Sequence, residues 1–274
     1  MTVINTNTNA LVARNAINAN SRTLQTAMQQ LATGSKINSA ADDAAGLAIR
    51  ENMTTQIKGF NAAVRNANDG ISLLQTADAA MEGMASMLQR MRELGVLAQN
   101  DTYSSAQRTA MDDEFQALLT EVDRVASDTE FNGFAVLDAS VASSFSFQVG
   151  PNSGESIAVV ISDQSTAGAL SAIASASVAS ATSAADAVTN LDTAIEALAS
   201  SRAVIGAGIN RLTYAADNAT NMSQNASAAR SQISDTDYAM ATSELARAQI
   251  IQQAGTAMLA QANQQPQTVL ALLR

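Results

Sequence analysis

The side chains that carry most enzyme chemistry are absent from this sequence or lack the partner residues that catalysis requires. The chain has no His and no Cys, which excludes imidazole acid–base catalysis, Ser-His-Asp triads, HExxH zinc sites, thiol nucleophiles and thiolate metal sites. Asp112, Asp113 and Glu114 form a carboxylate cluster, but no base stands near them in the sequence. We interpret the cluster as the solvated face of a helix. The sequence therefore predicts a protein that is not an enzyme and that binds no metal and no cofactor.

Other patterns match known ligand sites only in part. Asp235 and Asp237 lack the further oxygen ligands of a calcium loop, so we interpret them as helix caps. Gly206 and Gly208 lack the third glycine and the preceding strand of a dinucleotide-binding motif, and we expect them to permit close helix approach. The methionines between 81 and 91 have no His or Cys as co-ligands and are predicted to fill a core.

Composition predicts closely packed helices and excludes two classes of partner. Of the 274 residues, 47% are hydrophobic but only 3% are aromatic, so Ala and aliphatic side chains must form the core. A net charge of −10 without a Lys/Arg cluster excludes nucleic acid, and no uncharged apolar run is long enough for a membrane span. Residues 1–9 show no Sec signal, which indicates a cytoplasmic protein or one exported by another route.

The first half of the chain predicts long helices, because its first proline is Pro151. One long helix is expected over residues 41–99, about 88 Å long, with Asn38 and Ser39 as caps and acidic residues in its first turn. Before it, a coiled-coil spacing with one polar residue runs through Ala10, Ala13, Ile17, Asn20, Leu24, Ala27 and Leu31.

The rest of the chain adds one helical hairpin and one β-hairpin. A third helix is expected over 111–125, and alternating residues around the turn PNSG predict a β-hairpin between 145 and 161. Residues 163–183 are rich in Ala and Ser and are expected to form an exposed loop. A return helix of about fifty residues follows, and a last helix is expected from Tyr238 to about Ala262.

Charge is concentrated in the middle of the chain. Residues 42–240 hold 24 of the 25 acidic residues, whereas residues 1–41 hold no acid and residues 248–273 hold no charge. Uncharged amphipathic ends suit burial against identical copies, where like charges would repel. We therefore expect a polymerisation seam formed by Ile17, Leu24, Leu31, Ile250, Ile251, Met258 and Leu259.

Several motifs resemble bacterial flagellin, in order and over nearly the whole chain. They include VINTNTNALVARNAINAN, LATGSKINSAADDAAGLAI, TEFNGFAVLD, FQVGPNSGES and QAGTAMLAQANQ. The resemblance implies a mainly α fold, a long antiparallel helical bundle or coiled coil with one small β-hairpin region. It also implies domain D0 at 1–40 and 235–274 and domain D1 at 41–162 and 184–234. The loop 163–183 would then replace the variable domains D2 and D3.

The same resemblance implies a function and a set of partners. The chain is expected to form the extracellular flagellar filament with copies of itself, after secretion through the type III export apparatus with an export chaperone. Hook-associated and cap proteins are expected partners. A host Toll-like receptor is expected to bind Arg90, Leu94 and Glu114, with Leu94 as an apolar anchor and Gly95 loosening the helix. The terminal segments 1–40 and 236–274 are expected to be mobile in the free monomer.

Two alternatives remain open at this stage. A hook–filament junction protein would share similar ends. A cytoplasmic signalling coiled coil of the chemoreceptor type would share the Ala and Gln content, but it should be a continuous heptad hairpin without a β segment. The stretch FSFQVGPNSGESIAVVIS counts against this second alternative.

Overall fold

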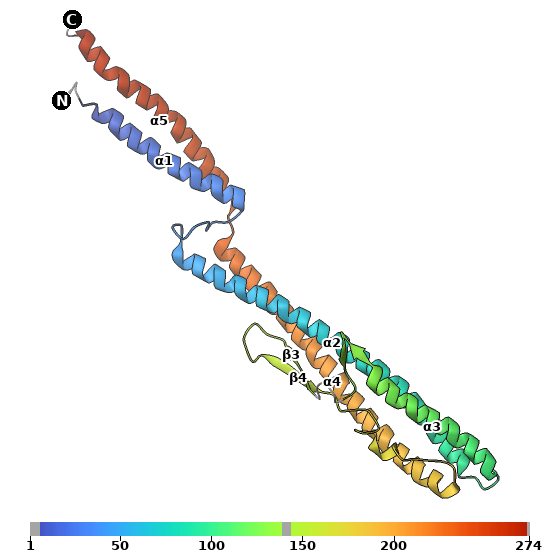
Figure 1. Cartoon of the computed structure of the whole chain (residues 1–274). Helices are drawn as coiled ribbons and strands as arrows, with labels where there is room; N and C mark the ends of the chain where they lie inside the picture. The colour runs from blue at the N-terminus through green and yellow to red at the C-terminus, as the bar shows by residue number, and fades with distance from the viewer. Residues whose placement is uncertain (1–5, 139–143, 273–274) are drawn as a thin grey trace. The chain divides into compact units, whose positions relative to one another are not determined.

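The computed structural model describes residues 6–138 and 144–272, with side chains described up to residue 264. This part of the chain contains five long helices and two small β-hairpins (Figure 1). The helices are α1 (Thr8–Thr33), α2 (Ala44–Ala98), α3 (Ser105–Asp128), α4 (Ala181–Ser234) and α5 (Tyr238–Leu272). The mainly α fold is therefore confirmed. None of the described helices is both long and apolar enough to cross a bilayer.

The predicted β-hairpin is confirmed, and a second, smaller one accompanies it. Strands β3 (Ser144–Gln148) and β4 (Ser156–Val160) pair antiparallel around the PNSG turn. The sequence pattern does not predict the other pair, β1 (Glu130–Phe131) and β2 (Phe134–Ala135). Asn132 and Gly133 join these strands with φ angles of 53° and 78°, which a two-residue hairpin turn of this hand requires.

The chain divides into two compact units. The first contains residues 1–55 and 225–274, and the second contains residues 56–224. We call them the terminal unit and the central unit.

In the terminal unit, α1 and α5 form an antiparallel coiled coil (Figure 1). The coiled-coil spacing expected for α1 is confirmed, because its residues are among the less exposed ones of that helix. On α5 the less exposed residues are Ala241, Leu245, Ala248, Gln252, Gly255, Leu259 and Ala262. The polar residue of the α1 seam, Asn20, donates from Nδ2 to Ala248 O at 2.7 Å and to Gln252 Oε1 at 3.2 Å.

The expected end of the last helix near Ala262 is wrong, because α5 continues to Leu272. A proline inside a helix removes one main-chain donor. Here Pro266 lies between glutamines and a VLALL run, which are mostly good helix formers, and the helix passes through it.

The residues that cap the N-termini of α2 and α5 were both predicted, and the prediction for α2 is wrong. Asp43 caps α2, since its Oδ1 accepts from the N–H groups of Ala45 and Gly46. Asn38 and Ser39 do not cap that helix; their main-chain N–H groups donate to Asp42 Oδ2. At α5 the predicted cap is confirmed for Asp237, whose Oδ1 accepts from two N–H groups of the first turn. It is wrong for Asp235, whose Oδ2 accepts from Ser231 Oγ of the preceding helix instead.

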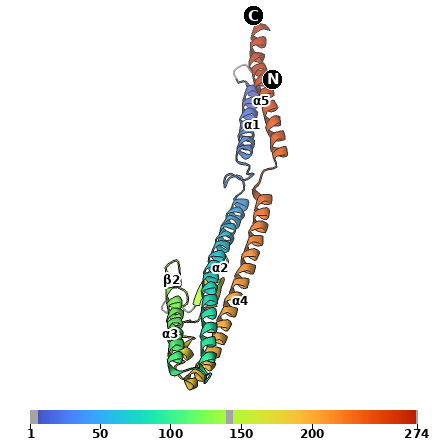
Figure 2. The ribbon, with the colours of Figure 1, turned by 90° about the vertical axis from the view of Figure 1, so that its right-hand side faces the viewer.

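In the central unit, α2 and α4 run antiparallel with α3 alongside (Figure 2). The core between them confirms the role predicted for the methionines: Met81, Met84 and Met91 are fully buried. Phe115 of α3 and Leu191 and Leu198 of α4 complete it.

Residues 162–180, which we call the strap, contradict the expected exposed loop. The strap contains a 3₁₀ turn at Ser171–Ile173 and buries Leu170, Ile173 and Val178 completely. Gln116 of α3 donates from Nε2 to Ala176 O at 2.9 Å and so ties the strap to that helix. These apolar residues are widely spaced in an Ala/Ser-rich stretch, so the sequence did not predict that they are buried. They pack on the core of the central unit.

The two glycines of α4 behave differently. A Cβ on Gly208 would lie 3.2 Å from Leu74 Cδ1 of α2 and 3.0 Å from Val159 Cγ2 of β4, so this glycine does permit the close approach of a helix and of a strand. A Cβ on Gly206 would meet no atom within 4 Å. The expectation of close packing is therefore confirmed at Gly208 and wrong at Gly206 within this chain.

Candidate functional site

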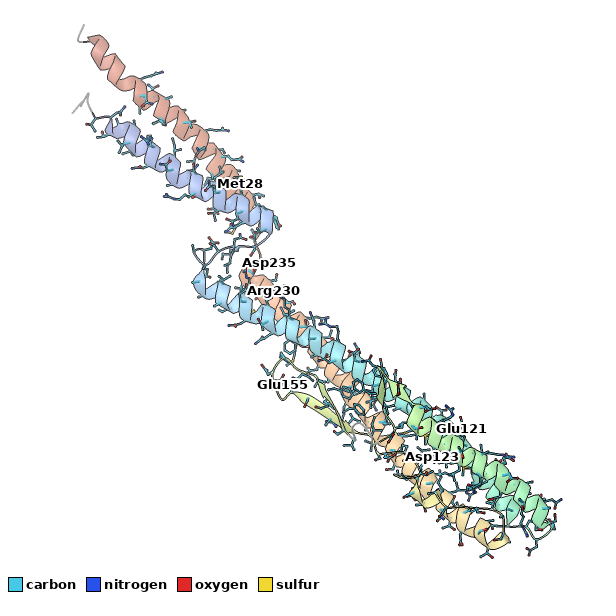
Figure 3. The ribbon with its side chains drawn as sticks, in the orientation of Figure 1. Met28, Glu121, Asp123, Glu155, Arg230 and Asp235 are labelled. Carbon is cyan, nitrogen blue, oxygen red and sulfur yellow. The ribbon has the colours of Figure 1, made fainter. Side chains whose placement is uncertain are left out.

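The α1/α5 pair leaves large apolar side chains uncovered on its outward side. Ile250 is 67% exposed and Met258 is 64% exposed, and Ile251, Leu11 and Val12 are also exposed. Met28 of α1 is another exposed apolar residue of this pair (Figure 3). Within the described residues no side chain covers them. An exposed apolar surface of this kind marks a site of association.

The predicted polymerisation seam therefore falls on two different faces. Ile17, Leu24 and Leu31 of α1, with Leu259 of α5, are half-buried and lie in the seam between the two helices. The outward residues are Ile250, Ile251 and Met258.

A groove of about 580 Å³ lies between α1 and α5. It is lined by small residues, among them Ala13, Ala16 and Gly255, and by Val12 and Met258. Gly255 is required there, because a Cβ would lie 2.9 Å from Ile17 Cγ1. The groove can hold an apolar side chain of another molecule.

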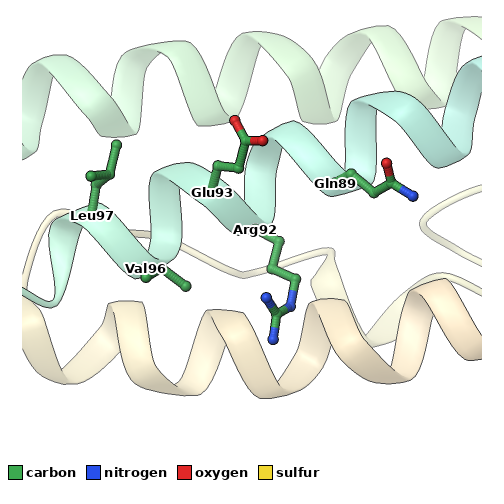
Figure 4. Close-up of a pocket in the computed structure, with 5 residues that line it drawn as sticks. All are labelled: Gln89, Arg92, Glu93, Val96 and Leu97. Carbon is green, nitrogen blue, oxygen red and sulfur yellow. The ribbon is translucent and has the colours of Figure 1, made fainter.

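A second groove, of about 550 Å³, lies on the exposed face of α2 in the central unit (Figure 4). Gln89, Arg92, Glu93, Val96 and Leu97 line it, and α2 lies between α3 and α4 in this view. Val96 and Leu97 are among the exposed large apolar side chains. The sequence alone predicts only a receptor patch and a solvated helix face along this stretch, so the groove is a feature that it does not indicate.

The three residues of the expected receptor patch do not share one surface. Arg90 Nε donates to Glu114 Oε1 at 2.9 Å, and its Nη1 donates to Glu93 Oε2 at 3.1 Å. The hydrogen bond with Glu114 is the main cause that raises the pKa of Arg90. Leu94, however, is only 2% exposed and belongs to the core. The expectation that Leu94 offers an apolar anchor is therefore wrong.

Gly95 has a packing role rather than a loosening one. A Cβ at this position would lie 2.9 Å from Val188 Cγ2, so the glycine lets α2 approach α4 closely. Nearby, Arg92 Nε donates to Asp192 Oδ1 at 2.6 Å, which lowers the pKa of that carboxyl group. Both contacts fix the groove-bearing end of α2 against α4.

The carboxylates Asp112, Asp113 and Glu114 do not form a catalytic cluster. Asp112 Oδ1 accepts the N–H of Val178 in the strap at 2.7 Å, and Glu114 pairs with Arg90. Asp113 is exposed, as expected for a solvated face. No group of three or more potential metal ligands occurs among the described residues.

Comparison with known proteins identifies the family. The bacterial flagellin N-terminal helical region matches residues 4–142, and the bacterial flagellin C-terminal helical region matches residues 188–273. Flagellin of Halalkalibacterium halodurans is 43% identical over 99% of this chain and 100% of its own length. Flagellin of Bacillus subtilis is 39% identical over 99% of both chains.

A solved structure shows the same fold. Bacillus cereus flagellin superposes with a TM-score of 0.51 at 32% identity, over 58% of this chain and 93% of that one. These matches give no support to a hook–filament junction protein or to a signalling coiled coil. The chain belongs to the bacterial flagellin family and is a structural subunit of the flagellar filament, not an enzyme.

Proposed function

We propose that the outward face of the α1/α5 pair is the surface through which copies of this chain pack in the filament. The observation that carries this proposal is the exposure of Ile250, Ile251 and Met258 beside a groove lined by small residues. Burial of apolar area stabilises an assembly by about 25 cal/mol per Å². A contact between unlike surfaces that does not close into a ring builds an open helical filament.

The lack of charge on this face supports the same proposal. In a homopolymer the same residue recurs at regular spacing, and a repeated charge would repel its own copies. Residues 248–264 of α5 carry no charged side chain. This part of α5 can therefore be buried without an unpaired charge, which is expensive to desolvate.

The outward apolar residues give a direct test. Ile251→Asn with Met258→Gln should keep the α1/α5 seam, because both side chains are exposed and neither is one of its half-buried residues. The variant should stay monomeric where the unmodified chain forms sedimentable filaments. As a matched control, Thr256→Asn changes an exposed polar residue of the same helix and should polymerise normally. Normal filaments from the Ile251/Met258 variant would contradict the proposal.

The domain assignment belongs to the same proposal. Residues 1–40 and 235–274 are assigned to D0, and residues 41–162 and 184–234 to D1. The pairing of α1 with α5 supports the first of these assignments, and the shared core of α2, α3 and α4 supports the second. The strap then occupies the place of the variable domains D2 and D3.

The exposed apolar residues also require protection before assembly. An export chaperone that covers Ile250 and Met258 would prevent premature polymerisation inside the cell. Residues 1–40, which carry no acid, are proposed as the segment that the type III export apparatus recognises. A reporter fused to residues 1–40 should be exported, and export of the full chain without those residues would contradict this assignment.

At the two ends of the polymer, hook-associated and cap proteins must meet surfaces that other subunits cover elsewhere. The α1/α5 face and the α2 groove are exposed apolar surfaces available for them. The extracellular filament is the expected location of the assembled chain, in accord with its family.

Recognition by a host Toll-like receptor is a second proposed function, supported by the exposed Arg90–Glu114 pair. An arginine that is already oriented by a carboxylate can donate further hydrogen bonds to a partner. Because Leu94 is buried, the apolar contact with the receptor is assigned instead to Val96 and Leu97, which are exposed near the same end of α2.

Arg90→Ala should lower the affinity of the monomer for the receptor at least about tenfold, the scale of a 1.4 kcal/mol loss. Arg124→Ala is a matched control, because Arg124 is also exposed and ion-paired but lies on α3 with Glu121 and Asp128. Equal affinity of the Arg90 variant and the unmodified monomer would remove Arg90 from the receptor site.

A further inference from the structure

The turn between β1 and β2 holds the single Asn–Gly pair of the sequence, Asn132 and Gly133. Both residues are exposed, and a Cβ on Gly133 would meet no atom within 4 Å. Asn132 has a φ of 53°, and in the described part of the chain no other residue except glycine has a positive φ. A side chain on the following residue would hinder a reaction of the Asn132 amide, and Gly133 has none.

The two groups of this pair that could react with each other have no other partner among the described residues. The side-chain amide of Asn132 makes no hydrogen bond with another described residue, and neither does the main-chain N–H of Gly133. The turn also has little support, because β1 and β2 have only two residues each. A hairpin this short opens at low cost in free energy.

The other asparagines that precede a small residue are held in place. Three of them are followed by Ser, and the Nδ2 group of each donates a hydrogen bond. Asn20 donates to Ala248 O at 2.7 Å, Asn38 to Ser35 O at 2.8 Å and Asn152 to Glu155 Oε1 at 2.9 Å. Asn132 therefore differs from them both in the residue that follows and in the freedom of its amide.

The reaction open to such a pair is the loss of ammonia. Once the Gly133 N–H has lost its proton to hydroxide, its nitrogen forms a bond with Asn132 Cγ. The Cγ–Nδ2 bond breaks, and the leaving nitrogen takes a proton from water and departs as ammonia. The resulting succinimide then takes up one water molecule at either of its carbonyl groups, which gives aspartate or isoaspartate. The reaction needs only water and hydroxide.

We propose that Asn132 is a site of spontaneous deamidation in the folded chain, and that isoaspartate at this position opens the β1/β2 hairpin. Isoaspartate leads the main chain through Cβ and Cγ and so lengthens it by one carbon atom. A two-residue turn has no room for this extra atom, because Phe131 and Phe134 pair directly on either side of it. Both products carry a new negative charge, so the converted fraction records the age of the chain.

Ageing of the purified chain tests the proposal. Cleavage after glutamate leaves Asn132 and the internal control Asn152 in one peptide, residues 131–155. After incubation at mildly alkaline pH, tandem mass spectrometry should show that Asn132 deamidates at least about tenfold faster than Asn152, a barrier difference of 1.36 kcal/mol. Labelling by an isoaspartate methyltransferase should appear with age. Asn132→Gly tolerates the positive φ and should remove most of this labelling.

Two results would overturn the site. One is an Asn132 that deamidates no faster than Asn152 in the folded chain. The other is an Asn132 that stays intact in the folded chain but is lost in urea, because the turn would then protect it.

Hydrogen exchange tests the opening of the hairpin. The N–H of Val136 donates to Thr129 O at 3.1 Å, next to the β1/β2 pair. This amide should lose protection in the aged chain and keep it in the equally aged Asn132→Gly variant. An aged chain that contains isoaspartate at position 132 and keeps the protection of Val136 would overturn the opening.

Discussion

Asp123 on α3 accepts two hydrogen bonds from Thr166 of the strap, from the main-chain N–H to Oδ1 at 2.8 Å and from Oγ1 to Oδ2 at 2.7 Å. Asp123 is labelled on α3 in Figure 3. Together with Asp112, which accepts from Val178, it holds the strap near both ends. The strap thereby covers the core with Leu170 and Ile173 instead of hanging in solvent.

Asp123→Ala should destabilise the central unit by about 1–2 kcal/mol, because it leaves two donors of Thr166 without their acceptor. Urea unfolding followed by circular dichroism measures this change. Asp113→Ala removes an exposed carboxylate from the same helix and should change the free energy of unfolding by less than about 0.5 kcal/mol. Equal stability of the two variants would show that the strap does not depend on Asp123.

Two glycines of α2 should respond in opposite directions to the same substitution. Gly83→Ala adds a Cβ that meets no atom within 4 Å, and it should stabilise the monomer by up to about 1 kcal/mol through helix propensity. Gly95→Ala places its Cβ 2.9 Å from Val188 Cγ2 and should destabilise the monomer despite the same gain in propensity. Thermal unfolding of both variants checks the pair, and a stabilised Gly95 variant would contradict the packing role.

Regular periodicity made the helices predictable from the sequence. The seam of α1 and the length of α2 follow from three-and-four spacing that continues over many turns. The strap was missed because Leu170, Ile173 and Val178 have no regular period in an Ala/Ser-rich stretch.

Which side chains of a helix are buried and which are exposed was harder to predict than the helices themselves. Large side chains were expected in the seam, but on α5 the inward positions hold mostly Ala and Gly while Ile250 and Met258 point outward. Leu94 shows the reverse error, since a residue expected at a surface is buried. The size of an apolar side chain does not show whether it lies in the seam. Its position in the three-and-four spacing of the helix decides which side chains pack against the second helix.

The terminal segments should be the first parts of the free monomer that a protease cuts. An isolated pair of helices with an uncovered apolar face gains little stability in water. Trypsin should therefore cleave at Arg14, Arg22 and Arg247 well before Arg90 or Arg202, whose side chains are ion-paired in the central unit. Mass spectrometry of early digests measures the order. Resistance of the three terminal sites in the monomer would contradict this expectation.

Acid should loosen the linker between α1 and α2. The main-chain N–H groups of Ser39 and Asn38 donate to Asp42 and lower the pKa of its carboxyl group. Because the pKa is lower in the folded chain, the stabilisation is present above the unfolded pKa near 4 and is lost as the pH falls through the folded value.

Hydrogen exchange measures this loss directly. The protection factors of the Asn38 and Ser39 amides should fall as the pH is lowered below about 4, once the intrinsic pH dependence of exchange is divided out. Asp42→Asn should remove this fall, because the amide does not titrate. A variant that keeps the same pH profile would contradict the assignment to Asp42.

Electron microscopy of the purified chain after seeding tests whether the α1/α5 face drives assembly of the filament. We expect helical filaments from the unmodified chain, and only monomers from the variant with Ile251→Asn and Met258→Gln. Because both side chains are exposed on α5, the variant should keep its helix content. Filaments of equal length and number from both chains would contradict the claim that this face carries the assembly.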